Sequence, residues 1–250
     1  MTRTVRIAAV SDVHCTRTSQ GTLAPLFAQA AREADVLLLP GDLTDYGTAD
    51  EAHVLAKELA GVRVPVIAVL GNHDFESGSP EDVRGVLAET GVTVLDGEAC
   101  EVQGVGFAGV KGFAGGFGRF TLGAWGEAAI KTFVREALDE ALKLEAALAR
   151  LRTPQRVAVL HYAPIAATVQ GEPTEIFPFL GTSRLEEPLT RYPVTAVFHG
   201  HAHAGTPEGQ LASGTPVYNV ALPLLRRHQP GAPYRVLELR AEEPSEQPSP

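Results

Sequence analysis

Short apolar runs separated by longer amphipathic stretches most limit what this chain can fold into. Five runs are rich in apolar and often β-branched residues, and turn-forming or polar residues bound each of them. The five runs are Val5–Val10, Asp35–Pro40, Val64–Leu70, Arg156–Leu160 and Val194–Phe198. Because each run is short for a helix, we predict that all five form buried strands.

The stretches between several of these runs have the pattern of amphipathic helices. Apolar residues recur at three- and four-residue spacing in Leu23–Ala34, Ala49–Leu59 and Pro80–Thr90, and Glu127–Leu151 carries one long apolar stripe. Such spacing places the apolar side chains on one face of a helix. Alternating strands and helices predict a sheet that is covered by helices.

Two further regions show closely spaced strands without helices. VTVL, ACEVQG and VGFAGV lie between Val92 and Val110, and Pro216–Val220 and Pro233–Leu239 follow later in the chain. We therefore expect two sheets packed together with helices outside, in a single domain over residues 1–240. Residues 241–250 are rich in Pro, Ser and Glu, which predicts a disordered tail.

Composition narrows the class of protein. The 250 residues carry a net charge of −9 and a pI near 5.4, and this acidic balance, without any Lys/Arg-rich run, disfavours nucleic acid as a partner. No apolar segment approaches the roughly 20 residues of a membrane span, and the N-terminus lacks the features of a signal peptide. Cys15 and Cys100 are far apart, which fits a reducing compartment. We expect a cytoplasmic protein that does not contact a membrane.

Polar side chains with metal-binding chemistry follow the five predicted strands. In chain order they lie in Asp12-Val13-His14, Gly41-Asp42-Leu43-Thr44-Asp45, Gly71-Asn72-His73-Asp74, His161 and Gly200-His201-Ala202-His203. Ligand sites of open α/β sheets lie beyond the carboxyl ends of the strands, so these groups are expected to meet in one crevice. Mixed imidazole and oxygen ligands suit Mn, Fe, Zn or Co better than calcium.

The ordered motif set DxH, GDxxD, GNHD, His and GHxH resembles the calcineurin-like metallophosphoesterase superfamily. The resemblance extends from Asp12 to His203 and implies a four-layer α/β/β/α sandwich of two mixed sheets with a dinuclear metal site at the strand ends. It implies that Asp12, His14 and His203 hold the first metal and that Asp42 bridges. Asn72, His161 and His201 would complete the second metal.

The same resemblance implies roles for two residues beside the metal ligands. His73 would assist the leaving group, and the carboxylate of Asp45 would hold the His73 ring through a hydrogen bond. Two divalent cations and two carboxylates leave about two positive charges, which a hydroxide and one phosphodiester anion would neutralise. A metal-activated hydroxide would be the nucleophile.

Sequence details select a branch of the superfamily. Tyr46 follows Asp45 and the third motif is GNHD, whereas the protein-phosphatase branch shows an arginine and GNHE there. His73 stands where the lipid-A-pathway hydrolases carry an arginine. The chain thus resembles the bacterial phosphodiesterase group, and we expect a small-molecule phosphodiester substrate of the cyclic-nucleotide or glycerophosphodiester type. The alternatives are a nuclease, a phosphomonoesterase and, more distantly, a metal-free protein-binding scaffold.

Two insertions lie between the motifs. Lys111–Gly126 mixes glycines with aromatic residues, and it forms either a lid or an irregular loop packed under the long helix. Ala163–Arg184 begins directly after His161 and its neighbour, which predicts a loop on the substrate side. The candidates for substrate contact are Lys111, Arg119, Arg184 and His199. For His199 the main expectation is packing or support of the site, because it lies inside a strand end.

Overall fold

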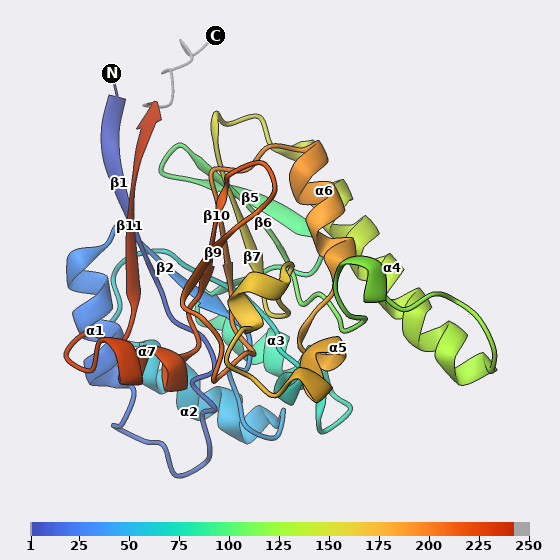
Figure 1. The fold of residues 1–250 in the computed structure, drawn as a ribbon. Coiled ribbons are helices and arrows are strands. Elements are labelled where there is room, and N and C mark those ends of the chain that lie inside the picture. Colours follow the sequence, from blue (N-terminus) through green and yellow to red (C-terminus); the bar gives the residue numbers. More distant parts are fainter. Residues whose placement is uncertain (1, 243–250) are drawn as a thin grey trace, which may run out of the picture.

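Two mixed sheets form the centre of the computed structural model, which describes residues 2–242 (Figure 1). The first sheet has the order β11 (Arg235–Glu242), β1 (Thr2–Ala9), β2 (Val36–Pro40), β3 (Val66–Val69) and β4 (Thr93–Val94). The second has the order β5 (Glu98–Val102), β6 (Val105–Val110), β7 (Gln155–Leu160), β8 (Ala196–His199), β10 (Pro216–Asn219) and β9 (Glu208–Gln210). The predicted ligands follow β1, β2, β3, β7 and β8. Of these strands, β1, β2 and β3 run parallel to one another in the first sheet, and β7 and β8 run parallel in the second.

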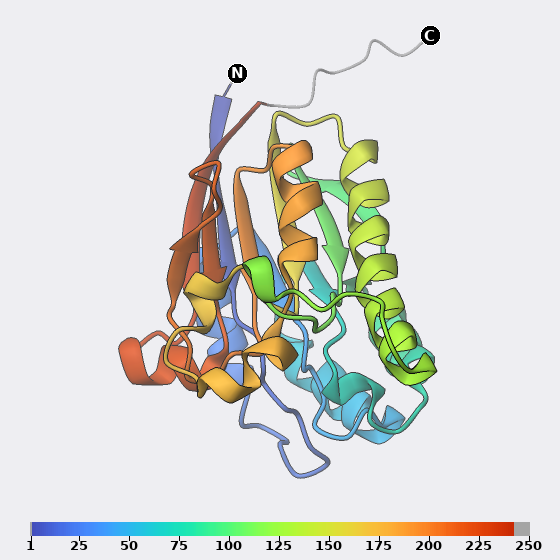
Figure 2. The same ribbon diagram turned by 45° about the vertical axis from the view of Figure 1, so that its right-hand side comes forward.

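Helices cover the outer faces of both sheets, as the turned view in Figure 2 shows. The first sheet carries α1 (Ala24–Glu33), α2 (Ala49–Leu59) and α3 (Pro80–Glu89), and the second carries α4 (Ala128–Arg150) and α6 (Glu186–Arg191). Two short helices, α5 (Phe177–Leu180) and α7 (Leu222–His228), lie in connections. The short 3-10 turns are η1 (His73–Phe75), η2 (Gly118–Phe120), η3 (Ala166–Val169), η4 (Thr174–Ile176) and η5 (Ser183–Leu185).

Three apolar cores lie between the four layers, because successive side chains along each strand point to opposite faces of its sheet. In β2, Val36 and Leu38 pack between the two sheets, while Leu37 and Leu39 pack beneath the helices of the first sheet. A strand buried on both faces reads as a continuous apolar run, because both faces need apolar side chains. The expected four-layer α/β/β/α sandwich is therefore confirmed.

Most predicted elements are present, and the exceptions lie late in the chain. The expected helix Ala49–Leu59 coincides with α2, whose N-cap Thr48 forms a capping box with Glu51. We did not predict β9 or the short helices α5, α6 and α7, because four to seven residues do not complete a recognisable helical stripe.

The end of the chain differs from the expected boundary. Strand β11 extends to Glu242, which pairs with Thr2, so the first two residues of the expected tail belong to the first sheet. The remaining residues, 243–250, lie outside the described part. Within residues 2–242, none of the helices is both long and apolar enough to span a bilayer.

Candidate metal centre

The predicted ligands converge at the carboxyl ends of β1, β2, β3, β7 and β8. Three groups of side chains each bring their ligand atoms within 4.8 Å of one another. The groups are Asp12, His14, Asp42 and His203; Asp42, His161 and His201; and His14, Asp45 and His73. Asp42 belongs to the first two groups, which is the placement expected of a ligand shared between two metals.

The backbone at these strand ends is in an unusual conformation. Among the described residues, five that are not glycine have a positive φ. They are Asp12 (54°), His14 (43°), Asp42 (48°), His201 (68°) and Gln103 (58°). Such a conformation costs about 1–3 kcal/mol and persists where the surrounding structure imposes it. Four of the five are predicted ligands, and Gln103 lies in the β5–β6 hairpin, so the strain is concentrated at the candidate site.

Glycines leave the space into which the carboxylates fit. A Cβ atom added at Gly71 would lie 2.1 Å from Oδ1 of Asp42, and one at Gly200 would lie 2.2 Å from Oδ2 of Asp12. Neither glycine has a positive φ, so both are needed for close approach rather than for backbone freedom.

In Asp42, Asn72 and His161, which we call the inner half, two side-chain oxygens face a ring nitrogen that carries no hydrogen. The main-chain carbonyl of Pro40 lies 3.1 Å from Nδ1 of His161 and can only accept, so Nδ1 carries the hydrogen. The other ring nitrogen, Nε2, lies 2.9 Å from Oδ1 of Asn72 and 3.3 Å from Oδ1 of Asp42. Burial lowers the pKa of His161 well below its usual value, so the ring is neutral. A cation fits this donor set.

His14, His73 and His203, the outer half, have partly exposed rings. Nδ1 of His14 lies 3.2 Å from Oδ1 of Asp45, whereas Nε2 is buried, has no hydrogen-bond partner and lies 3.7 Å from Oδ2 of Asp42. Burial lowers the pKa of His14, which favours a neutral ring with a free electron pair. A carboxylate that accepts from one ring nitrogen and leaves the other free is the usual support of a metal-binding histidine.

Asp12 connects the site to the turn that follows β8. Its carboxylate accepts the main-chain N–H of His201 at 3.0 Å and lies 2.9 Å from Nε2 of His203. Burial opposes the charged form, but the hydrogen bond with His203 lowers the pKa of Asp12 overall. The same hydrogen bond raises the pKa of His203.

His201 is oriented through its Nε2 atom. This atom lies 3.1 Å from the carbonyl oxygen of Phe179, which can only accept, so Nδ1 is the nitrogen left for a metal. Burial lowers the pKa of His201, and its ring lies 4.4 Å from that of Tyr162. The ring is therefore neutral and packed on one side.

The two central carboxylates need a cation to be charged together. Burial, followed by the charges of Asp12 and Asp74, raises the pKa of Asp42 to about 9. Buried carboxylates that lie close together cannot both ionise unless a positive charge compensates them. The ring of His161, the nearest titratable neighbour of Asp42 in the inner half, is neutral and does not compensate that charge, so the residues present fit a metal centre.

The expected contact between Asp45 and His73 has a different form. Nδ1 of His73 donates to the main-chain carbonyl of Asp45 at 2.8 Å, and the Asp45 carboxylate is 3.7 Å away. That carboxylate instead lies closer to His14. His73 is therefore oriented by the backbone, with Nε2 free, because the turn after β2 places the carbonyl against the ring.

Asp74 and His199 support the site from beneath. Fully buried Asp74 accepts hydrogen bonds from the main-chain N–H groups of Leu43, Thr44 and Gly71 and from the Thr44 hydroxyl, and it joins the ends of β2 and β3. His199 is also fully buried, with Nδ1 2.8 Å from the Gly200 carbonyl and Nε2 2.8 Å from the Thr168 hydroxyl. Both nitrogens of His199 are thus engaged away from any substrate.

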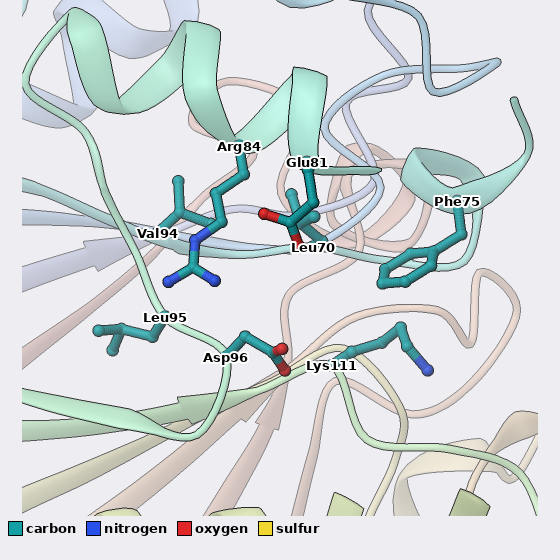
Figure 3. A pocket seen from close by; sticks show the side chains of 8 residues that line it. All are labelled: Leu70, Phe75, Glu81, Arg84, Val94, Leu95, Asp96 and Lys111. Carbon is teal, nitrogen blue, oxygen red and sulfur yellow. The ribbon is translucent and has the colours of Figure 1, made fainter. Parts of the chain in front are cut away.

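Lys111 is buried rather than open to a substrate. Figure 3 shows it with Phe75 at a cavity of about 20 Å³, roughly the space for one water molecule. Its ammonium group is 4.8 Å from the Phe113 ring centre and 3.9 Å from Glu136. Burial lowers the pKa of Lys111. These contacts anchor the start of the first insertion.

Arg184 and Arg119 also have contacts of their own. Arg184 donates to the carbonyl of Leu122 at 2.9 Å and so ties the second insertion to the first. Arg119 is exposed and stacks on Phe120, with the guanidinium carbon 4.7 Å from the ring centre.

Sequence reasoning missed the groups that hold the histidine turn after β8. The side-chain amide of Asn219 donates to the carbonyl of Ala202 at 2.8 Å, and Tyr162 packs on His201. Asn219 ends β10, so the reasoning that found the other strand-end residues contained a signal for it. The carbonyls of Pro40 and Phe179 have no such signal.

A four-layer α/β/β/α sandwich that gathers carboxylates, an amide and imidazoles at its strand ends has the architecture of a metal-dependent phosphoesterase. The sequence profile of the calcineurin-like phosphoesterases matches residues 5–205, and the chain belongs to this family. No curated protein matches the chain in sequence.

Solved structures share the fold at low sequence identity. The phosphopantetheinyl hydrolase of Mycobacterium tuberculosis has a TM-score of 0.68 at 18% identity, over 92% of this chain and 95% of that one. GAP50, described as the anchor in the inner membrane complex of Plasmodium, has a TM-score of 0.53 at 12% sequence identity, over 88% of this chain and 72% of that one. A Staphylococcus aureus protein described as a 5′-nucleotidase has a TM-score of 0.51 at 16% sequence identity, over 87% of this chain and 48% of that one. These similarities concern the fold alone.

Proposed function

We propose that this phosphoesterase hydrolyses a small-molecule phosphodiester, of the cyclic-nucleotide or glycerophosphodiester type, with the help of two transition-metal ions. Asp12, His14 and His203 would hold the first ion, and Asn72, His161 and His201 the second. Asp42 would bridge the two. Mn, Fe, Zn and Co all suit this mixture of nitrogen and oxygen ligands.

The observation that carries the proposal is the charge of the donor set. Burial lowers the pKa values of His14, His161 and His201, so these ligands are neutral, and Asp12 and Asp42 are the carboxylates. The pKa of His203 is raised by its hydrogen bond with Asp12, so this ring would give up its proton when it binds a metal. Two divalent cations with two carboxylates have a net charge of about +2. One phosphodiester anion together with one hydroxide balances that charge. When bound, the ions supply Lewis-acid activation of water and of the phosphoryl oxygens.

His73 is the group of this chain that would handle the proton of the leaving group. Its Nδ1 donates to the Asp45 carbonyl, so Nε2 is the ring nitrogen available to a leaving group. The His73 ring lies 4.4 Å from that of His14, at the exposed side of the site, where a substrate can reach it. An imidazolium in this place can donate to an alkoxide leaving group.

Hydrolysis of matched substrates tests the proposal. The protein is incubated with manganese and with bis(p-nitrophenyl) phosphate, p-nitrophenyl phosphate, cyclic AMP and single-stranded DNA. We expect the diesters of small molecules to be hydrolysed faster than the monoester, and DNA to remain intact. Rapid cutting of DNA alone would instead make the protein a nuclease, and a preference for the monoester would make it a phosphomonoesterase.

A metal-free scaffold is the alternative outside enzymology. The similarity to GAP50 shows that this fold also occurs in a protein described as an anchor, so the fold by itself does not favour an enzyme. All seven predicted ligands nevertheless lie at the one site. Absence of bound metal by elemental analysis, together with inactivity after addition of manganese, would support the scaffold.

A further inference from the structure

Resting on the proposed function, we propose that an apolar groove beside the metal centre binds the organic arm of the substrate, so that among the proposed types a diester with an alkyl or aryl arm and a separate leaving group is favoured over a cyclic nucleotide. The groove lies between the two insertions, and its occupant is the ester group that stays on the phosphate during hydrolysis.

The two insertions form one cap. Gly115 and Gly116 donate main-chain hydrogen bonds to the carbonyls of Pro178 and Gly181 at 2.7 and 2.9 Å, and Ser183 donates back to Gly116 at 3.1 Å. In Figures 1 and 2 the green loop before α4 lies beside the orange segment with α5. Because main-chain hydrogen bonds join the two, the groove between them has fixed walls.

The groove has the size and lining of a site for an apolar group. It encloses about 390 Å³, within the range of small-molecule sites. Its lining consists of Gly116, Phe117, Phe120, Ala166, Thr174, Phe177 and Pro178. The hydroxyl of Thr174 is the one polar side-chain group in that set. A sugar hydroxyl or a charged headgroup would lose its hydrogen bonds to water there without replacement.

The groove is built on the same segments that support the metal centre. Phe117 and Phe177 pack against an apolar cluster that contains Ala202, the residue between His201 and His203. In addition, α5 supplies both groove residues and the Phe179 carbonyl that orients His201. A substrate whose phosphate lies at the metal ligands therefore has its arm within reach of the groove.

Exposed rings at the cap show that apolar surface is left uncovered in this chain alone. The side chain of Phe120 is 74% exposed although it lines the groove, and that of Phe179 is 59% exposed. Apolar surface of this kind beside a catalytic site is typical of substrate binding.

The test uses p-nitrophenyl phosphodiesters that differ only in the second ester arm, with manganese present. Each methylene removed from water contributes about fourfold in binding. The three extra methylenes of a butyl arm, partly covered in an open groove, are expected to raise kcat/KM about tenfold over a methyl arm. A 2,3-dihydroxypropyl arm of similar size is expected to bring no gain. Equal rates for the butyl and dihydroxypropyl arms would overturn the groove assignment.

Variants of the groove locate the effect. Phe120→Ala removes an exposed ring, and Thr174→Phe fills the groove without removing any apolar group, so neither depends on the loss of buried packing. Both are expected to bring the butyl-to-methyl ratio of kcat/KM towards one. Leu142→Ala removes an exposed apolar side chain of α4 and is expected to keep the wild-type ratio.

The outcomes separate this inference from the proposed function. Failure to hydrolyse any of the diesters with manganese overturns the proposed function itself. If the diesters are hydrolysed with the same kcat/KM whatever their second ester arm, the proposed function is retained and the inference is overturned. A dimer that dissociates in Phe120→Ala, measured by sedimentation, would assign the groove to a second copy of this chain and likewise overturn it.

Discussion

The inner and outer halves of the site are built on different physical principles. In the inner half, His161 is fully buried, and a main-chain carbonyl fixes its tautomer. In the outer half, the side chains of His14, His73 and His203 are 21%, 39% and 41% exposed. There, Asp12 and Asp45 carboxylates position two of the three rings.

This difference suggests a division between holding and reacting. A buried donor set whose positions the backbone imposes loses little entropy when it takes up a metal ion. Partly exposed rings with titratable partners exchange protons and ligands more readily. We therefore expect the second metal, at Asn72, His161 and His201 (the inner position), to be held more tightly. The first metal, at Asp12, His14 and His203 (the outer position), should respond to metal concentration and pH.

The largest effect is expected for Asp42→Asn, which removes the carboxylate common to both positions. Because metal activation supplies several kcal/mol of transition-state stabilisation, activity should fall about 10³-fold. Elemental analysis should show loss of metal from both positions. Asp139→Asn, an exposed change on α4, is the matched control. Retention of both metals in Asp42→Asn would contradict a bridging role.

His73→Ala separates proton transfer from metal binding within the outer half. General acid catalysis typically contributes 10²–10⁴-fold, so turnover should fall about 10²-fold for diesters with alkoxide leaving groups. It should fall much less for p-nitrophenyl esters, whose leaving group needs no proton. Metal content should be unchanged, and His53→Ala on α2 is the control. Loss of metal would make His73 a ligand instead.

The variant Asp45→Asn tests whether the Asp45 carboxylate orients His14 or His73. Since the carboxylate lies nearer to His14 while the backbone holds His73, we expect metal affinity at the outer position to fall about 10–100-fold. Excess manganese should restore activity, whereas Asp50→Asn should need no rescue. A loss that manganese does not restore, and that depends on the leaving group, would assign the carboxylate to His73.

The smallest effect concerns the stability of the metal-free protein. Because the pKa of Asp42 is raised from 3.8 to about 9, the folded state holds a proton that the unfolded state has lost. That contribution to stability is lost as pH rises through the folded pKa. The melting temperature of the protein in EDTA should therefore fall by a few degrees between pH 7 and 9.

The same measurement on Asp42→Asn is the control for this prediction. The raised pKa of His203 adds a decline of the same sign, so the variant should show a shallower fall in melting temperature rather than none. The neutral rings of His14, His161 and His201 do not contribute above their unfolded pKa of about 6.5. An equal fall in the variant and the wild type would assign the whole pH dependence to groups other than Asp42.

Local patterns in the sequence were sufficient to predict the sandwich and the place of the site. Apolar runs such as Val36–Pro40 identify strands buried on both faces, and the polar residues that follow them identify the edge where ligands meet. Both signals depend on neighbours within a few residues. They failed for α7 and β9, which are too short to show a periodicity.

The protonation and pairing of the ligands were decided by the tertiary structure. His161 owes its tautomer to Pro40, 121 positions away, and His73 and His201 owe theirs to carbonyls 28 and 22 positions away. A main-chain carbonyl is present in every residue, so it leaves no mark in a sequence. Packing also buried Lys111 and His199, two candidates for substrate contact, and joined two insertions into one cap. The sequence by itself determined which chemical groups meet, and the fold decided which of their atoms face one another.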